Sequence, residues 1–221
     1  MPCEVGRRPV DDGRRGLVQS VRLPIMDPRP LVFDLNEAGR AGLSAMAVRH
    51  GVRTGRFVRL RRGLFCDAQL WQRSGASPMA RQVLETRAAW LALGRRGWAS
   101  HYSAAVLHGL PVPHGQPSSV TISQANRSNG RHRLPGLVLR TVTVDPVDIQ
   151  TDWGMPILSP ARTSLDVARV HGFAPALVLA DATLARGTAT VAELDRIAAS
   201  MKGWKGAVGV RLVAHNASRP P

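Results

Sequence analysis

The sequence has almost no lysine, no long apolar run and few cysteines. Only Lys202 and Lys205 are lysines, and the longest apolar region, residues 174–185, is too short for the roughly 20 apolar residues that span a bilayer. Cys3 and Cys66 lie far apart without a C-x-x-C pair, which excludes a disulfide framework and argues against a thiolate metal site. No apolar stretch follows the first arginines, as a secretory signal requires. We therefore expect a reduced, soluble, cytoplasmic protein.

Motifs for catalysis are also missing. A (D/E)-x-K nuclease triplet needs an acid two residues before a lysine, but Ser200 precedes Lys202 and Gly203 precedes Lys205. The chain contains neither a G-x-x-x-x-G-K-[ST] phosphate loop nor a G-x-S-x-G nucleophile elbow. We predict no enzyme, no catalytic residues and no cofactor.

Two groups of candidate metal ligands are better interpreted as structural. His101 and His108 are seven residues apart, about 10.5 Å along a helix, too far to share one ion by themselves. With His114 they could form a looser site, but zinc sites prefer i, i+3 or i, i+4 pairs or cysteine partners. We predict that these histidines are core or capping residues. The acidic cluster consists of Asp145, Asp148 and Asp152. Its spacing does not match a calcium loop, so we expect a solvated turn and no metal.

What the chain does have is positive charge. Its 221 residues carry a net charge of +15, with a pI near 11.7. Residues 1–66 contain thirteen arginines against six acidic residues, and residues 67–144 contain nine against two, whereas residues 145–221 are almost balanced. A GC-rich coding bias explains abundant arginine but not this uneven distribution. The excess favours a polyanionic partner, either nucleic acid or an acidic membrane face.

A compact helix–turn–helix–hairpin pattern occupies residues 30–68. Residues 36–41 form a short predicted helix that Gly42 ends. Ser44 then caps a second helix to about Thr54, with Val48 and Val52 facing a core. Residues 57–60 alternate as a strand, with Val58 and Leu60 inward, and residues 61–63 turn the chain back. This order is typical of a winged helix-turn-helix.

The second helix and the hairpin would both present cations to a DNA duplex. Helix residues approach base edges, and hairpin residues bind the phosphate backbone. The predicted DNA-binding residues are Ser44, Arg49, His50, Arg53, Arg59, Arg61 and Arg62. A small helical subdomain with a solvated charged face remains an alternative. Gly51 is unexpected in the second helix, because glycine costs about 1 kcal/mol relative to alanine there.

The remaining chain divides into an arm, a second domain and a tail. Residues 1–29 show no periodicity and are predicted to be a disordered basic arm, either trailing along phosphates or inert; Met26 is a possible start. Residues 67–76 read as a polar linker, residues 77–213 as a mixed α/β domain, and residues 214–221 as a tail. The predicted fold class is α+β: a winged helix-turn-helix, then a mixed α/β domain with C-terminal helices.

Within the second domain the pattern gives both helices and strands. The predicted helices cover residues 77–93, 100–108, 159–170, 173–185 and 190–201, and the predicted strands cover residues 119–123, 137–144 and 155–158. Arg162 is in the first turn of its helix, where the helix dipole disfavours a cation. We predict that Arg162 pairs with Asp166. Four tryptophans are expected in the core: Trp90, Trp98, Trp153 and Trp204.

Three sequence blocks resemble one family. Residues 42–44 and 55–65 read Gly-Leu-Ser and Gly-Arg-Phe-Val-Arg-Leu-Arg-Arg-Gly-Leu-Phe. Residues 99–111 and 158–169 read Ala-Ser-His-Tyr-Ser-Ala-Ala-Val-Leu-His-Gly-Leu-Pro and Leu-Ser-Pro-Ala-Arg-Thr-Ser-Leu-Asp-Val-Ala-Arg. Together they are similar to AbiEi-family antitoxin-like proteins over roughly residues 31–213.

The resemblance implies a bacterial regulator of a type IV toxin–antitoxin system. In that family the N-terminal winged helix represses its own operon, and the second domain helps to neutralise a nucleotidyltransferase-type toxin. The implied partners are therefore double-stranded DNA and such a toxin, and not a membrane. Many relatives continue into a PD-(D/E)xK nuclease domain, and we expect no such domain within these 221 residues. Alternatives are a protein-binding antitoxin module without DNA binding and a truncated relative of a nuclease-bearing member.

Overall fold

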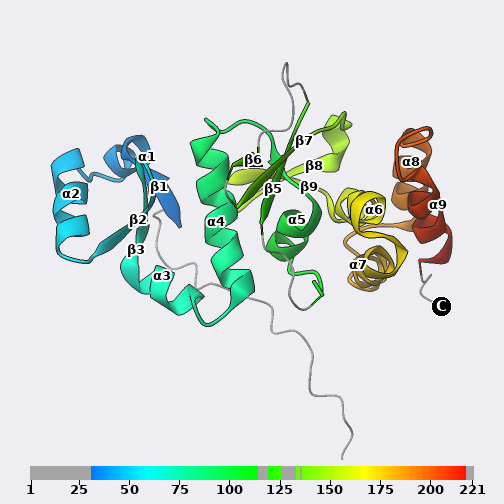
Figure 1. The fold of residues 1–221 in the computed structure, drawn as a ribbon, viewed down its shortest axis with the longest axis horizontal. Coiled ribbons are helices and arrows are strands. Elements are labelled where there is room, and N and C mark those ends of the chain that lie inside the picture. The colour runs from blue at the N-terminus through cyan, green and yellow to red at the C-terminus, as the bar shows by residue number, and fades with distance from the viewer. Residues whose placement is uncertain (1–30, 114–118, 126–132, 135, 218–221) are drawn as a thin grey trace, which may run out of the picture.

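The computed structural model describes residues 31–113, 119–125, 133–134 and 136–217 (Figure 1). The predicted arm (residues 1–29), Cys3, Met26 and His114 lie outside the described residues. The elements are β1 (Val32–Asp34), α1 (Leu35–Arg40), α2 (Ala45–Arg53), β2 (Phe57–Arg61), β3 (Leu64–Asp67), α3 (Ala68–Ser74), α4 (Pro78–Ala92), β4 (Trp98–Ala99), α5 (His101–Leu107), β5 (Val120–Gln124), β6 (Arg133–Leu134), β7 (Leu137–Thr141), the 3₁₀ turn η1 (Pro146–Asp148), β8 (Ile149–Asp152), β9 (Met155–Leu158), α6 (Pro160–His171), α7 (Phe173–Ala185), α8 (Val191–Ser200) and α9 (Ala207–Asn216). The predicted α+β class is confirmed.

The N-terminal unit is built on a three-stranded antiparallel sheet of order β1-β3-β2. Strand β1 was not predicted; it ends at Asp34, which caps α1 by accepting a 2.8 Å hydrogen bond from the Glu37 amide. Ser44 caps α2, as predicted, with its hydroxyl accepting from the Ala47 amide at 3.1 Å. The order of these elements and the β2–β3 hairpin are consistent with a winged helix. No helix precedes β1 within the described residues.

Both faces of this sheet are covered, which the sequence pattern did not reveal. On one face five buried residues, the phenylalanine cluster, join the sheet to α1 and α2: Phe33, Ala38, Val48, Phe57 and Phe65. On the other face Val32, Leu64 and Cys66 pack with α4 in the main core, and Leu60 packs against the same core. The prediction that Val58 and Leu60 face the interior was therefore incomplete, because Phe57 is only 3% exposed on the opposite face.

Gly51 proves to be a packing requirement rather than a weakness. A Cβ atom placed on Gly51 would lie 2.5 Å from Cδ2 of Phe57 and 2.8 Å from its Cε2. The Phe57 ring is itself held edge-on against Phe33, with ring centroids 5.3 Å apart. Glycine therefore lets α2 approach the sheet closely enough to cover this ring.

The segment after the hairpin is a helix, so the prediction of a polar linker over residues 67–76 was wrong. Asp67 caps α3 by accepting from the amides of Gln69 and Leu70 at 2.9 and 3.1 Å. Arg81 of α4 lies over the Trp71 ring, 3.5 Å from its centroid, and donates to the Trp71 carbonyl. These contacts join α3 to α4.

The second sheet is mixed, with the order β6-β7-β5-β4-β9-β8. Strands β5 and β7 pair in parallel, as do β4 and β9, and the other pairs are antiparallel. The three predicted strands correspond to β5, β7 and β9, whereas β4, β6 and β8 were not predicted. Helices α6 to α9 gather beyond the sheet, at the end of the molecule opposite α2 (Figure 1).

The helix starts of the second domain follow the sequence signals closely. Ser77 and Ser159, each followed by proline, cap α4 and α6, and Thr190 forms a capping box with Glu193 at α8. The described residues contain one further helix, α9, which was not predicted and which extends to Asn216, so the prediction that the tail begins at residue 214 was wrong. Trp90 is buried, and Trp98, Trp153 and Trp204 are partly buried.

A network of buried charges connects α6 to the neighbouring elements. The predicted pair is confirmed: Nε of Arg162 lies 3.2 Å from Oδ2 of Asp166, and both side chains are buried. Asp148 belongs to the same network, 3.9 Å from Arg162 and in contact with Arg196. The expectation that Asp148 belongs to a solvated turn was therefore wrong; Asp145 and Asp152 are exposed, as expected.

Arg87 joins the N-terminal unit to the second domain. From α4 its guanidinium donates to the Val32 carbonyl at 2.9 Å and to the Glu37 carboxylate at 2.9 Å. It also donates to the carbonyls of Trp153 and Gly154 in the turn between β8 and β9. One buried arginine thus fixes the strand that begins the N-terminal unit against the second sheet.

His101 is buried and His108 is partly buried, as predicted for core residues. His108 lies 2.7 Å from the Leu158 carbonyl, and His101 lies 3.0 Å from the Ser100 hydroxyl. Within the described residues no group of three or more His, Cys, Asp or Glu side chains could hold a metal ion. Burial raises the pKa of the Cys66 thiol to about 12. Among the described residues, none of the helices combines the length and the apolar composition that a membrane span requires.

Acidification should destabilise the fold through its buried histidines. Burial lowers the pKa of His101 well below 6.5, with Arg140, His171, Arg169 and Arg162 acting in the same direction. Below pH 6.5 the unfolded chain therefore takes up a proton that the folded chain does not. His101 alone should cost about 1 kcal/mol between pH 6.5 and 5.5.

Urea unfolding at both pH values measures this loss. The pKa of the partly buried His108 is also lowered, mainly by burial, and that of the surface residue His171 is lowered by partial desolvation and by Arg140, so their contributions have the same sign. His101→Asn should reduce the pH slope, because asparagine does not titrate in this range. Equal slopes in the wild type and His101→Asn would contradict this assignment.

Candidate nucleic-acid interface

Helix α2 has a buried face and an exposed face. Val48 and Gly51 are buried and Val52 is partly buried against the phenylalanine cluster. The spacing i, i+3, i+4, i+7 places a second set of side chains together on the opposite face. This exposed stripe of α2 consists of Met46, Arg49, His50 and Arg53. The predicted exposure of Arg49, His50 and Arg53 is thus confirmed.

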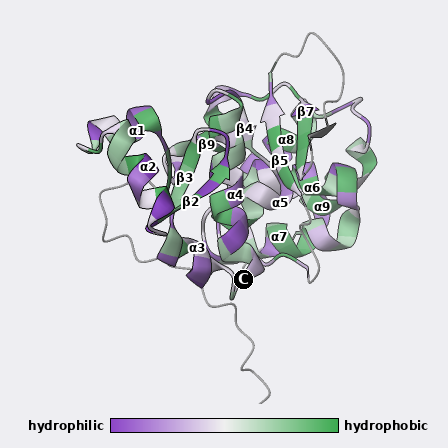
Figure 2. Cartoon of the chain, turned by 60° about the vertical axis from the view of Figure 1, so that its left-hand side comes forward, coloured by the Kyte–Doolittle hydropathy of each residue, from purple (hydrophilic) through white to green (hydrophobic). Residues whose placement is uncertain are grey.

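The exposed stripe is free of competing acidic partners among the described residues. Arg53 Nη2 lies 3.5 Å from Nδ1 of His50 within the stripe. Ser44, Ala45, Met46 and Ala47 are also exposed, so the first turn of α2 is reachable from outside. Figure 2 shows purple, hydrophilic segments on α2 and on the neighbouring hairpin.

The β2–β3 hairpin adds its own cations. Arg59 is paired directly with Phe65, whose ring lies in the phenylalanine cluster, so strand alternation places Arg59 on the α2 side of the sheet. Beyond it the register shifts between Arg59 and Arg61, and the chain turns at Gly63 with φ of 74°. Arg59 and Arg62 are exposed, and Arg61 is partly exposed.

Two further arginines belong to this region and were not among the predicted residues. Arg40 is exposed in the last turn of α1, and Arg56 is exposed between α2 and β2, with its guanidinium 5.2 Å from the Phe57 ring centroid. Arg56 could have been identified from the sequence, because it immediately precedes the strand predicted over residues 57–60. Met46, 77% exposed, was also missed, because an apolar residue in a helix is normally expected to be buried.

The arrangement therefore consists of a short helix with an exposed cationic stripe and a hairpin that presents further arginines. Such a surface can bind a polyanion through direct hydrogen bonds from the guanidinium groups to phosphate oxygens. With α2 projecting from one end of the molecule, the second domain does not cover it (Figure 1). The nine residues of α2 give this helix a length of about 13 Å.

Comparison with known proteins supports the resemblance found in the sequence. Residues 31–66 match the family model described as transcriptional regulator, AbiEi antitoxin. The match covers β1 through most of β3, so it includes α2 and the hairpin, and it confirms the resemblance over these residues. The blocks at residues 99–111 and 158–169 lie outside the match. No curated protein matches the chain.

Proposed function

We propose that this chain, which resembles AbiEi antitoxins over residues 31–66, is a DNA-binding transcriptional regulator. The observation that carries the proposal is the exposed stripe of α2, opposite a face anchored in the phenylalanine cluster. A helix held in this way can enter the major groove, which is about 12 Å wide. Family resemblance further supports regulation of its own operon.

Each element has a distinct role in the proposed complex. Arg49, His50 and Arg53 approach base edges, where an arginine fork can bind guanine O6 and N7. Ser44 lies at the N-terminal end of α2, where backbone N–H groups and the helix dipole favour a phosphate. The hairpin residues Arg59, Arg61 and Arg62 bind the phosphate backbone and fix the register of the helix on the duplex. Arg40 and Arg56 extend the same cationic surface.

The test is an electrophoretic mobility shift assay with the DNA duplex from upstream of the gene that encodes this chain. The assay is repeated at increasing salt concentrations. If about five arginines contact phosphates, the logarithm of the association constant should fall against the logarithm of salt concentration with a slope near −4.5 per protomer. An unrelated duplex of equal length measures non-specific binding. The absence of a shift, or affinity independent of salt, would overturn the proposal.

Hairpin substitutions should weaken binding without changing its sequence preference. Arg61→Ala combined with Arg62→Ala removes two proposed phosphate contacts, so the salt slope should become shallower by about 1.8. The matched control is Arg186→Ala combined with Arg211→Ala, which removes the same charge from exposed positions of the second domain. If both double variants lose affinity equally, net charge and not the hairpin governs binding.

Helix substitutions should instead relax sequence preference. Arg49→Ala removes a proposed base contact, worth about 1–3 kcal/mol of discrimination between cognate and unrelated duplexes. The measurement is the ratio of the two dissociation constants at one salt concentration. An unchanged ratio in Arg49→Ala and in Arg53→Ala would show that α2 does not read bases.

Because the chain resembles AbiEi-family antitoxins, we propose a nucleotidyltransferase-type toxin as its second partner. The structural observation that favours a protein partner is a pair of exposed apolar residues one turn apart on α9, Val208 and Leu212. Co-purification with the product of the adjacent gene tests this, and Val208→Asp with Leu212→Asp should abolish it. If the chain binds that protein but no DNA, the antitoxin module without DNA binding is the correct alternative.

A further inference from the structure

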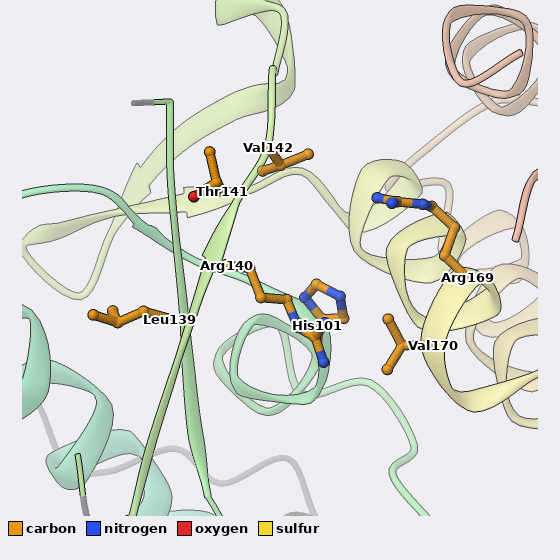
Figure 3. Close-up of a pocket in the computed structure, with 7 residues that line it drawn as sticks. All are labelled: His101, Leu139, Arg140, Thr141, Val142, Arg169 and Val170. Carbon is orange, nitrogen blue, oxygen red and sulfur yellow. The ribbon is translucent and has the colours of Figure 1, made fainter. Parts of the chain in front are cut away.

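A cavity in the second domain is independent of the proposed DNA-binding surface. It has a volume of about 340 Å³ and lies where the start of α5, strand β7 and the end of α6 meet (Figure 3). Its polar lining includes His101, Arg140 and Arg169, and Leu139, Val142 and Val170 also border it. Cavities of this size accommodate small ligands. In Figure 1 these elements lie well away from α2.

His101 is held in this cavity by an unusual backbone and a chain of hydroxyl groups. Its φ angle is 53°, in the left-handed region that few non-glycine residues occupy. The Ser123 hydroxyl donates to the Ser100 hydroxyl at 2.7 Å, and Ser100 lies 3.0 Å from Nδ1 of His101. In the tautomer in which the Ser100 hydroxyl donates to Nδ1, the imidazole carries its proton on Nε2.

This Nε2 atom is the anomaly that points to a ligand. The His101 side chain is buried, with the residue 3% exposed, and its Nε2 has no hydrogen-bond partner among the described residues. Leaving a buried donor unsatisfied costs about 1–3 kcal/mol. Figure 3 shows the imidazole between Arg140 on β7 and the α6 residues Arg169 and Val170. A ligand that accepts a hydrogen bond here would relieve the cost.

The charged residues around the cavity favour a negatively charged ligand. Arg140 and Arg169 line the cavity. Burial and the nearby arginines lower the pKa of His101, so its imidazole is neutral and can act as a hydrogen-bond donor. The nearest carboxylate of the network, Asp166, lies 3.4 Å from Nη1 of Arg169 but is also bound to Arg162. Arg169 is further held by the Lys205 carbonyl at 3.2 Å and by the Trp204 ring. Two guanidiniums and one neutral N–H form a donor set suited to an anion.

We propose that this cavity binds a phosphate group, either as inorganic phosphate or as part of a small phosphate monoester. Nε2–H of His101 and the guanidiniums of Arg140 and Arg169 donate to the phosphate oxygens. Val142 and Val170 form the apolar wall that holds the organic part of a monoester, whereas the Leu139 side chain points to the opposite face of β7 (Figure 3). Because the site is separate from α2, the proposal does not depend on DNA binding.

Isothermal titration of the full chain with three probes tests the proposal. The probes are sodium phosphate, adenosine 5′-monophosphate and adenosine, all at constant ionic strength because a basic protein attracts anions non-specifically. Phosphate and the monophosphate should bind, and adenosine should not. Tighter binding of the monophosphate than of phosphate identifies a monoester site, and equal binding identifies a site for the inorganic ion. No binding of either at millimolar concentration would overturn the proposal.

Matched variants separate the cavity from the general positive charge. Arg169→Gln should weaken phosphate binding about tenfold, whereas Arg211→Gln, which removes an exposed arginine from α9, should not. His101→Asn should weaken it similarly, because asparagine tolerates the positive φ angle but does not reach as far. If Arg211→Gln has the same effect as Arg169→Gln, the cavity is not the site.

A spectroscopic measurement on the wild type guards against variants that fail to fold. In a ¹⁵N-labelled sample the Nε2–H signal of His101 should shift on addition of phosphate, while the imidazole signals of the exposed His50 and His215 serve as reference. A shift of His101 that saturates with the calorimetric dissociation constant supports the site. An unmoved His101 signal at saturating phosphate would contradict it.

Discussion

Replacement of Asp166 with alanine should lower the free energy of unfolding by about 3–5 kcal/mol. The carboxylate is fully buried and contacts two guanidiniums, those of Arg162 at 3.2 Å and Arg169 at 3.4 Å. Arg162 is only 1% exposed, so without Asp166 its charge would stay buried, with its nearest remaining carboxylate, Asp148, 3.9 Å away. Burial tends to raise the pKa of Asp166, and the two arginines oppose this rise.

Urea unfolding of Asp166→Ala and of a matched control measures the effect. Asp195→Asn removes one negative charge from an exposed position on α8, and it should change the free energy of unfolding by less than about 0.5 kcal/mol. A loss below about 1 kcal/mol in Asp166→Ala would mean that water reaches Arg162 once the carboxylate is removed.

The Arg162–Asp166 pair also shows what local sequence rules can predict. A cation in the first turn of a helix is unfavourable unless a carboxylate one turn later compensates it. Arg162 and Asp166 are four residues apart, which places them on the same face of the helix. The same reasoning applies to the caps at Ser44, Ser77 and Thr190, whose hydrogen bonds reach only three residues along the chain. Local signals were therefore sufficient to predict α2, α4, α6 and α8.

Features that depend on distant parts of the chain were not accessible in this way. Strand β4 has two residues and exists because Ala99 pairs with both Ile122 and Ile157. Asp148 is buried by contacts with Arg162 and Arg196, which follow it by 14 and 48 residues. For the candidate DNA-binding residues, the exposure of Arg49, His50 and Arg53 followed from helical periodicity, whereas that of Met46 did not. The proposed phosphate cavity could not be predicted, because its lining residues come from α5, β7 and α6, which are distant in sequence and meet only in the folded chain.

The same limit explains the misjudged glycine, and it leads to the second prediction. Gly51→Ala should lower the free energy of unfolding by about 1–2 kcal/mol, although helix propensity alone predicts a gain of about 1 kcal/mol. The added methyl would lie 2.5 Å from a carbon of the Phe57 ring, which is enclosed by Phe33 and cannot move away freely. The matched control is Gly39→Ala in α1, where a Cβ atom meets nothing within 4 Å. It should stabilise by about 0.5–1 kcal/mol.

Thermal or urea unfolding of both variants decides between the two arguments, and a third substitution locates the cause. Phe57→Leu shortens the side chain that the new methyl would strike, so in its presence Gly51→Ala should cost less than in the wild type. Equal costs in the two backgrounds would exclude a clash with Phe57. Because Gly51 sets how closely α2 approaches the sheet, Gly51→Ala should also weaken binding to the upstream duplex, while Gly39→Ala should leave it unchanged. A stabilised Gly51→Ala would show that α2 is not seated against the phenylalanine cluster as described.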